Sequence, residues 1–162
     1  NGRDRTGILI HNPIGWLMTH INSNFALFKD NGVRYIGRVL LALRPGRNDK
    51  KFIEVADRLT QFYGANFTLM RVVNKDIPEE QYRDLEQTST ELINSSKSES
   101  NLEIIKSNDA IETISVQSAS YDLLILGSPR NDSWVSVLFG KGRDKFTEKS
   151  ACSVLRLTLR DS

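Results

Sequence analysis

The chain has 162 residues, of which 39% are hydrophobic and 26% are charged, and its formal net charge is +2. This length predicts one domain with a hydrophobic core, and the small net charge excludes a general nucleic-acid binder. No apolar run approaches the ~20 residues of a membrane span, so no direct membrane insertion is expected, and the single cysteine, Cys152, excludes an internal disulfide.

Residues 1–37 are predicted to be an N-terminal extension of a domain that covers residues 38–162. Two apolar stretches, Phe25–Phe28 and Val33–Ile36, flank a Lys-Asp-Asn-Gly sequence, and an Asn-Gly pair accepts the positive φ of a tight turn. We therefore expect a hairpin over 25–36. Because the chain lacks an initial Met and its N-terminal side is basic, we also expect it to be a piece of a longer protein.

From Arg38 onward, short apolar strands alternate with amphipathic helices. The expected strands are Val39–Leu43, Phe67–Val73, Leu102–Ile105, Leu123–Leu126 and Ser153–Leu159. In the first helix, apolar residues recur at helical spacing and Gly64 provides the C-terminal stop. The second helix has Pro78 in its first turn, and Asp109 caps the third.

This alternation predicts an α/β fold with a five-stranded, parallel, doubly wound sheet. In such sheets, ligands bind beyond the carboxyl ends of the strands, where the strand order reverses. The loops after Leu43 and after Leu126 are therefore the candidate binding loops.

The region 36–160 resembles the universal stress protein family. The likeness is carried by the order of elements, by "SASYDLLILGS" leading into a glycine loop, and by the closing "SACSVLRL". The family's loop pattern is Gly, two residues, Gly, nine residues, Gly, then Ser or Thr, and Gly127 and Gly140 match its first and third glycines. Asp122 matches the family's Asp before the fourth strand. The resemblance implies a fold of the adenine nucleotide alpha hydrolase-like type.

Three positions depart from the family's nucleotide binders. Arg130 replaces the second glycine, Lys141 replaces the Ser or Thr, and Arg44 replaces the Asp after the first strand. Arg130 adds bulk where backbone amides would approach a phosphate, although the added cations attract anions. We therefore expect a degenerate loop and no cofactor, with an adenine nucleotide as the alternative ligand. The candidate ligand-binding residues are Arg44, Gly127, Arg130, Gly140 and Lys141.

The stretch "FALFKDNG" at 25–32 resembles the start of stress-protein-like domains carried by prokaryotic cation–chloride cotransporters and amino-acid permeases. This resemblance implies a cytoplasmic regulatory and assembly domain, tethered to the inner face of the plasma membrane, whose partner is the membrane domain of the same transporter. Two alternatives stay open: a free-standing ATP- or AMP-binding universal stress protein, and a nucleotide hydrolase of the same superfamily fold.

Family members commonly dimerise through their last strands, so the resemblance also implies a homodimer. The strand residues expected to pair are Val154, Leu155, Arg156, Leu157 and Leu159. An unpaired strand edge here would otherwise favour aggregation.

We expect no enzyme activity and no metal site. No Ser/His/Asp order, carboxylate pair or metal-ligand spacing is present, and His11 and His20 lie far from Cys152, which is expected to be a buried core thiol.

Overall fold

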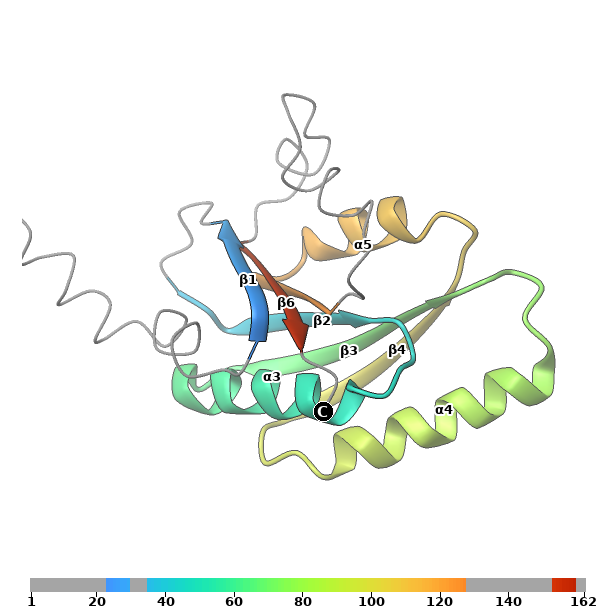
Figure 1. The fold of residues 1–162 in the computed structure, drawn as a ribbon, viewed down its shortest axis with the longest axis horizontal. Helices are drawn as coiled ribbons and strands as arrows, with labels where there is room; N and C mark the ends of the chain where they lie inside the picture. Colours follow the sequence, from blue (N-terminus) through green and yellow to red (C-terminus); the bar gives the residue numbers. More distant parts are fainter. Residues whose placement is uncertain (1–22, 30–34, 128–152, 160–162) are drawn as a thin grey trace, which may run out of the picture.

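The computed structural model describes residues 23–29, 35–127 and 153–159, with side chains described for 35–127. A six-stranded sheet in the order β1-β6-β5-β2-β3-β4 forms its centre (Figure 1). The strands are β1 (Ser23–Lys29), β2 (Arg38–Leu43), β3 (Asn66–Val73), β4 (Ser100–Lys106), β5 (Leu123–Gly127) and β6 (Ser153–Leu159). Neighbours among β2 to β6 are parallel, which confirms the predicted five-stranded parallel sheet, and β1 joins β6 antiparallel.

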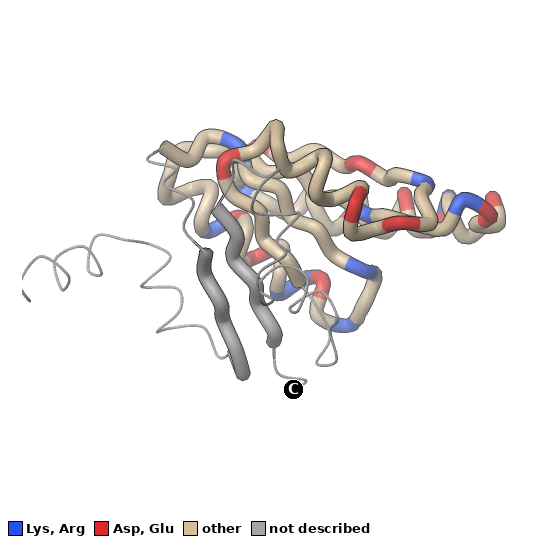
Figure 2. The backbone as a smooth tube through the Cα atoms, turned by 90° about the horizontal axis from the view of Figure 1, so that it is seen from above, with Lys and Arg blue, Asp and Glu red and all other residues tan. Residues whose placement is uncertain are grey.

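Helices cover both faces of this sheet. Helices α3 (Asp49–Tyr63) and α4 (Glu79–Asn94) lie on one face, and α5 (Ala110–Ser118) lies on the other (Figure 1). The Lys, Arg, Asp and Glu residues are carried mainly by helices and loops (Figure 2). The doubly wound α/β architecture expected from the alternating sequence pattern is therefore confirmed.

The core has two parts because alternate strand residues point to opposite faces of the sheet. The part under α3 and α4 contains Val39, Leu41, Leu43, Phe67, Leu69, Leu123 and Ile125, with Phe52, Ile53, Ala56, Leu59 and Ile93 from the helices. The part under α5 contains Leu40, Ala42, Met70, Leu124 and Leu126, with Ile114 from the helix. Burial on both faces explains why these strands are continuous apolar runs rather than alternating ones.

Local signals fix most helix ends. Gly64 ends α3 with a φ of 64°, a conformation that favours glycine, and the Asp109 side chain accepts a hydrogen bond of 3.0 Å from the Glu112 backbone N–H at the start of α5. Both predictions are confirmed. Pro78 lies just before α4 rather than in its first turn, and β4 begins at Ser100, two residues before the start of the predicted strand Leu102–Ile105.

The N-terminal strand has a different partner from the one expected. The strand predicted within 25–36 is present as β1, but its partner is β6, with Ala26 opposite Leu157. Tyr35 and Ile36 are not in a strand, and the intervening residues 30–34 lie outside the described residues. The hairpin over 25–36 therefore stays a prediction, and the structure adds a pairing of β1 with the distant strand β6.

This pairing changes the position of β6 in the sheet. One edge of β6 pairs with β5 and the other pairs with β1, over register pairs that include Leu155 with Phe28 and Arg156 with Leu27. The expectation that the last strand offers an unpaired edge is wrong, because β1 occupies that edge. The homodimer itself stays a prediction.

A hydrogen-bond network ties α3 to the loop before β4. The Asp57 carboxylate accepts bonds from the backbone N–H groups of Ser98, at 2.8 Å, and Lys97, at 3.1 Å. Thr60 Oγ1 donates to Ser98 Oγ at 2.7 Å. Partial burial acts to raise the pKa of Asp57, but the hydrogen bonds from Ser98, Lys97 and Gln61 outweigh it and hold that pKa below its ordinary value of 3.8.

Candidate functional site

The strand order reverses between β2 and β5, where a parallel sheet of this kind usually binds a ligand. The last residues of these strands, Leu43 and Gly127, lie opposite each other in the sheet. Arg44 follows Leu43 directly and is exposed. The structure therefore brings two of the predicted ligand-binding residues, Arg44 and Gly127, to the same edge of the sheet, whereas Arg130, Gly140 and Lys141 lie outside the described residues.

Gly127 is required here by side-chain packing. A Cβ atom added at Gly127 would overlap Leu43 Cδ2 and would lie 3.1 Å from both Cε1 and Cζ of the Phe52 ring. Leu43 and Phe52 are both buried. The space beside this glycine is thus filled by apolar side chains of β2 and α3, which explains the glycine without a phosphate.

Asp122, which the family resemblance also singled out, lies at the opposite end of β5. Its Oδ2 atom accepts hydrogen bonds of 2.9 Å from the backbone N–H groups of Gly37 and Arg38, and its own N–H donates to the Arg38 carbonyl. Asp122 therefore joins the beginnings of β2 and β5. It is a structural residue, remote from the carboxyl ends where a ligand would bind.

A buried arginine, Arg71, connects β3 with the helices α3 and α4. The Arg71 side chain, on β3, is 1% exposed and forms an ion pair of 2.8 Å with Asp49 at the start of α3. Its Nε donates to Ser89 Oγ on α4 at 3.2 Å, and its Nη1 has no partner within the described part of the chain. A charge in the middle of an apolar strand, "TLMRVV", was the available sequence signal, and the sequence analysis did not single it out.

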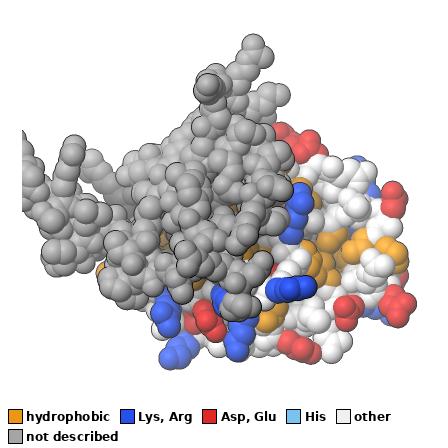
Figure 3. Space-filling model, in the orientation of Figure 1, with side chains coloured by type: hydrophobic (Ala, Val, Ile, Leu, Met, Phe, Trp, Pro, Cys, Tyr) orange, Lys and Arg blue, Asp and Glu red, His pale blue; other side chains and the backbone are white. Residues whose placement is uncertain are grey.

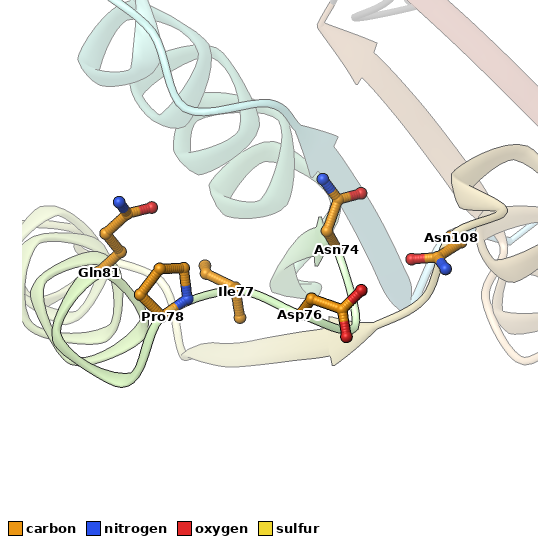
Figure 4. A pocket seen from close by; sticks show the side chains of 6 residues that line it. All are labelled: Asn74, Asp76, Ile77, Pro78, Gln81 and Asn108. Atoms are coloured by element: carbon orange, nitrogen blue, oxygen red, sulfur yellow. The ribbon is translucent and has the colours of Figure 1, made fainter.

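A surface pocket lies beyond the carboxyl ends of β3 and β4, next to the ends of β2 and β5. It has a volume of about 500 Å³ and is lined by the side chains of two loops and the first turn of α4 (Figure 4). The lining residues are Asn74, Asp76, Ile77, Pro78, Gln81 and Asn108. The sequence pattern pointed to the loops after β2 and β5 and not to this site, although Asn74 directly follows β3 and Asn108 lies two residues beyond the end of β4.

Exposed charges are separated on the surface. The exposed charged residues of α4 are mainly acids, and red side chains are visible at the lower right of Figure 3, where α4 lies. The exposed acids of α4 are Glu79, Glu80, Asp84, Glu86 and Glu91. The β2–α3 loop and the start of α3 expose cations instead: Arg44, Arg47, Lys50 and Lys51. Of the basic N-terminal side expected from the sequence, Arg38, Arg44 and Arg47 have described side chains, and all three are exposed.

The described residues contain no cluster of His, Cys, Asp and Glu suited to holding a metal ion. Within that part of the chain, no helix has the length and apolar character needed to cross a membrane.

Comparison with known proteins identifies the fold. No protein-family model and no curated protein matches the sequence. A universal stress protein from Archaeoglobus fulgidus matches with a TM-score of 0.57 at 10% identity, over 76% of this chain and 94% of that one. A universal stress protein in complex with cAMP matches with a TM-score of 0.56 at 12% identity, over 78% and 99%. The chain has a universal stress protein-like fold.

The cytoplasmic domain of a prokaryotic cation chloride cotransporter has the same fold. It matches with a TM-score of 0.53 at 13% identity, over 82% of this chain and 51% of that one. The chain thus spans about half the length of that domain. At these identities, the universal stress protein-like structures establish the arrangement of the chain and leave its ligand and partners to be argued from its own residues.

Proposed function

We propose that the chain is a cytoplasmic regulatory and assembly domain of a prokaryotic membrane transporter, of the cation–chloride cotransporter or amino-acid permease type. It works through protein contacts, tethered at the inner face of the plasma membrane. Its partners are the membrane domain of the same transporter and a second copy of itself. It performs no catalytic step.

The observation that carries this proposal is the packing at the β2/β5 edge. Leu43 and Phe52 fill the space beside Gly127, and a cation, Arg44, replaces the carboxylate of the nucleotide binders at the adjacent position. A nucleotide would need backbone amides and an acceptor at this edge. A domain that acts through contacts with other proteins needs neither the backbone amides nor the acceptor at this edge.

The transporter enters the proposal through the likeness to the cotransporter's cytoplasmic domain, which extends over 82% of this chain. The separated surface charges support it further. Cytoplasmic loops of membrane proteins carry an excess of Lys and Arg, and the acidic face of α4 complements such loops.

The alternative is a free-standing universal stress protein that binds an adenine nucleotide. The chain covers 94% and 99% of two universal stress proteins that it matches, and the solved structures include complexes with cAMP and with dAMP. These complexes support nucleotide binding as the alternative function.

Thermal unfolding of the chain with and without millimolar ATP, ADP and AMP separates the two candidates. A ligand at about 100 times its Kd adds roughly 2.7 kcal/mol to the unfolding free energy. The proposal expects no shift that depends on Arg44 and no nucleotide turnover above background. A shift that is lost in Arg44→Ala would favour the stress-protein alternative.

Transporter attachment is tested in the gene and in the cell. The reading frame upstream of residue 1 should encode membrane spans, and deletion of residues 35–162 should change solute flux by the assembled transporter. A frame without membrane spans contradicts the proposal. The full-length transporter with residues 35–162 intact is the control for the deletion.

A further inference from the structure

The pocket of Figure 4 lies beyond the carboxyl ends of β3 and β4. Asn74 and Asp76 come from the loop after β3, and Asn108 comes from the loop after β4. Pro78 and Gln81, at the start of α4, lie on the opposite side, with Ile77 between the two groups (Figure 4). Its volume is about 500 Å³, and it is an open surface pocket, because all its lining residues except the half-buried Ile77 are exposed.

Hydrogen bonds hold the two loops in place. The Ile77 N–H donates to the Asn74 carbonyl at 3.2 Å, which closes a turn in the first loop. The Ser107 N–H donates to the Val73 carbonyl at 2.8 Å. The Lys75 N–H donates to Asn108 Oδ1 at 3.1 Å, which joins the loops directly. The pocket is therefore formed before any ligand arrives, which lowers the entropic cost of binding.

The bond from Lys75 also sets the orientation of the Asn108 amide. Its oxygen is held by a backbone donor, so the Nδ2 group remains to donate to a ligand. Asp76 can only accept hydrogen bonds when ionised, whereas the amides of Asn74 and Gln81 do both. The pocket thus offers donors and acceptors around a short apolar surface made by Ile77 and Pro78.

This chemistry selects against ions. A single lining carboxylate is too few ligands for a resident metal cation. Three acids near the pocket, Asp76, Glu79 and Glu80, outnumber the exposed Lys75 of the same loop, so the net charge there disfavours anions. The nearby Lys106 ammonium lies 4.8 Å from the centre of the Tyr82 ring, an interaction that already engages this cation. A neutral ligand is left as the best fit.

We infer that this pocket binds a small uncharged ligand with neighbouring hydroxyl groups. A hydroxyl donates to the Asp76 carboxylate while accepting from the Asn108 amide, and the C–H face of a sugar or polyol packs on Ile77 and Pro78. The hydroxyls come from a free sugar or polyol, or from the ribose of a larger molecule. The inference does not depend on attachment to a transporter.

The test is a titration of the ¹⁵N-labelled 162-residue chain with D-ribose and with 2-deoxyribose, followed by NMR. Ribose is expected to give saturable shifts of the Asn74, Gln81 and Asn108 side-chain amides, and 2-deoxyribose is expected to bind more weakly because it lacks one hydroxyl of the pair. A titration with adenosine distinguishes a free sugar from the ribose of a larger molecule as the source of the hydroxyl groups. Tighter binding than ribose assigns the diol to a nucleoside, and equal binding assigns it to the free sugar.

Matched variants place the site. Asp76→Asn and Asn108→Asp should each weaken ribose binding by about tenfold, since each removes one hydrogen-bonding function from the pocket. Asn108→Asp keeps the acceptor for the Lys75 N–H, so the loops stay joined. The same chemical changes at exposed positions outside the pocket, Asp84→Asn and Asn101→Asp, should leave binding unchanged.

Two results would overturn the inference: no saturable shift with ribose or adenosine up to the solubility limit, or binding that Asp76→Asn and Asn108→Asp leave unchanged. The nucleotide experiment on the β2/β5 edge is independent of both, because its diagnostic variant, Arg44→Ala, lies outside the pocket lining.

Discussion

At the scale of single residues, Gly127 owes its place to Leu43 and Phe52, and Gly127→Ala tests this directly. The added methyl overlaps Leu43 Cδ2 in a buried, closely packed region. We expect a loss of about 1–3 kcal/mol in the free energy of unfolding, as for other overpacked cores. Urea unfolding curves measure it.

The matched control for this change is Gly46→Ala. A Cβ there has its nearest neighbours at 3.8 Å and 3.9 Å, an ordinary contact distance, and the backbone has no positive φ. Gly46→Ala should therefore leave the unfolding free energy nearly unchanged. A Gly127→Ala protein as stable as its parent would mean that the glycine is not held by packing, and a ligand role would have to be reconsidered.

The buried ion pair makes a second residue-scale prediction. Asp49→Ala leaves the Arg71 guanidinium, which is 1% exposed, without its carboxylate, and should cost about 3–5 kcal/mol of stability. The double variant Asp49→Ala with Arg71→Met should recover much of this loss, because the buried charge is gone. Chemical unfolding of the single and double variants measures the recovery.

The control for the ion pair is Glu79→Ala, which breaks the surface pair of Glu79 with Arg83. Those side chains are 65% and 75% exposed, so the cost should stay below about 1 kcal/mol. Equal losses for Asp49→Ala and Glu79→Ala would contradict the assignment of a buried, stabilising pair.

Residues whose role is set by near neighbours in sequence were predictable. Gly64 and Asp109 act within one turn of their own helices, and both were read correctly. Gly127 was assigned to a degenerate nucleotide loop, and its close packing against Phe52, 75 positions away in the chain, was not foreseen. Arg71 is also held by residues of other elements, Asp49 and Ser89. Spacing alone does not reveal such contacts.

At the scale of elements, the attachment of α3 to the loop before β4 predicts a pH dependence. The folded pKa of Asp57 lies below its ordinary value of 3.8, so the unfolded chain binds the proton first as the pH falls. The stabilisation from Asp57 is therefore complete above the unfolded pKa and is lost as the pH falls through the folded one.

Asp57→Asn exposes this effect. The variant should be less stable than the parent chain near neutral pH, and the difference should shrink once the pH falls below about 4. Urea unfolding of both proteins at a series of pH values measures the difference, and Glu54→Gln, on the same helix, measures the general cost of removing an exposed acid from α3. A difference that stays constant with pH would show that the Asp57 carboxylate does not hold the loop.

The five parallel strands were predictable because each is a buried apolar run bounded by turn residues. The partner of β1 was not. A strand pattern states that residues will pair, but two strands separated by more than 120 residues carry no local signal of register. The pocket was missed for a related reason, since two loops distant in sequence meet there only after β3 and β4 have paired.

At the scale of the whole molecule, the sheet has β1 and β4 at its edges, and β6 is interior. A homodimer of the full chain that pairs β6 with β6 would require β1 to leave. While β1 is in place, the proposed second copy must bind through another surface.

Removing β1 should therefore make the molecule self-associate. A chain lacking residues 1–29 leaves the β6 edge unpaired, and such an edge pairs readily with another strand. The control lacks residues 1–22 and keeps β1 (Ser23–Lys29). Light scattering across a concentration series should show larger assemblies for the shorter chain, with helical circular dichroism confirming that it is folded. The same oligomeric state for both chains would mean that an exposed β6 edge does not drive self-association, and would contradict a protective role of β1.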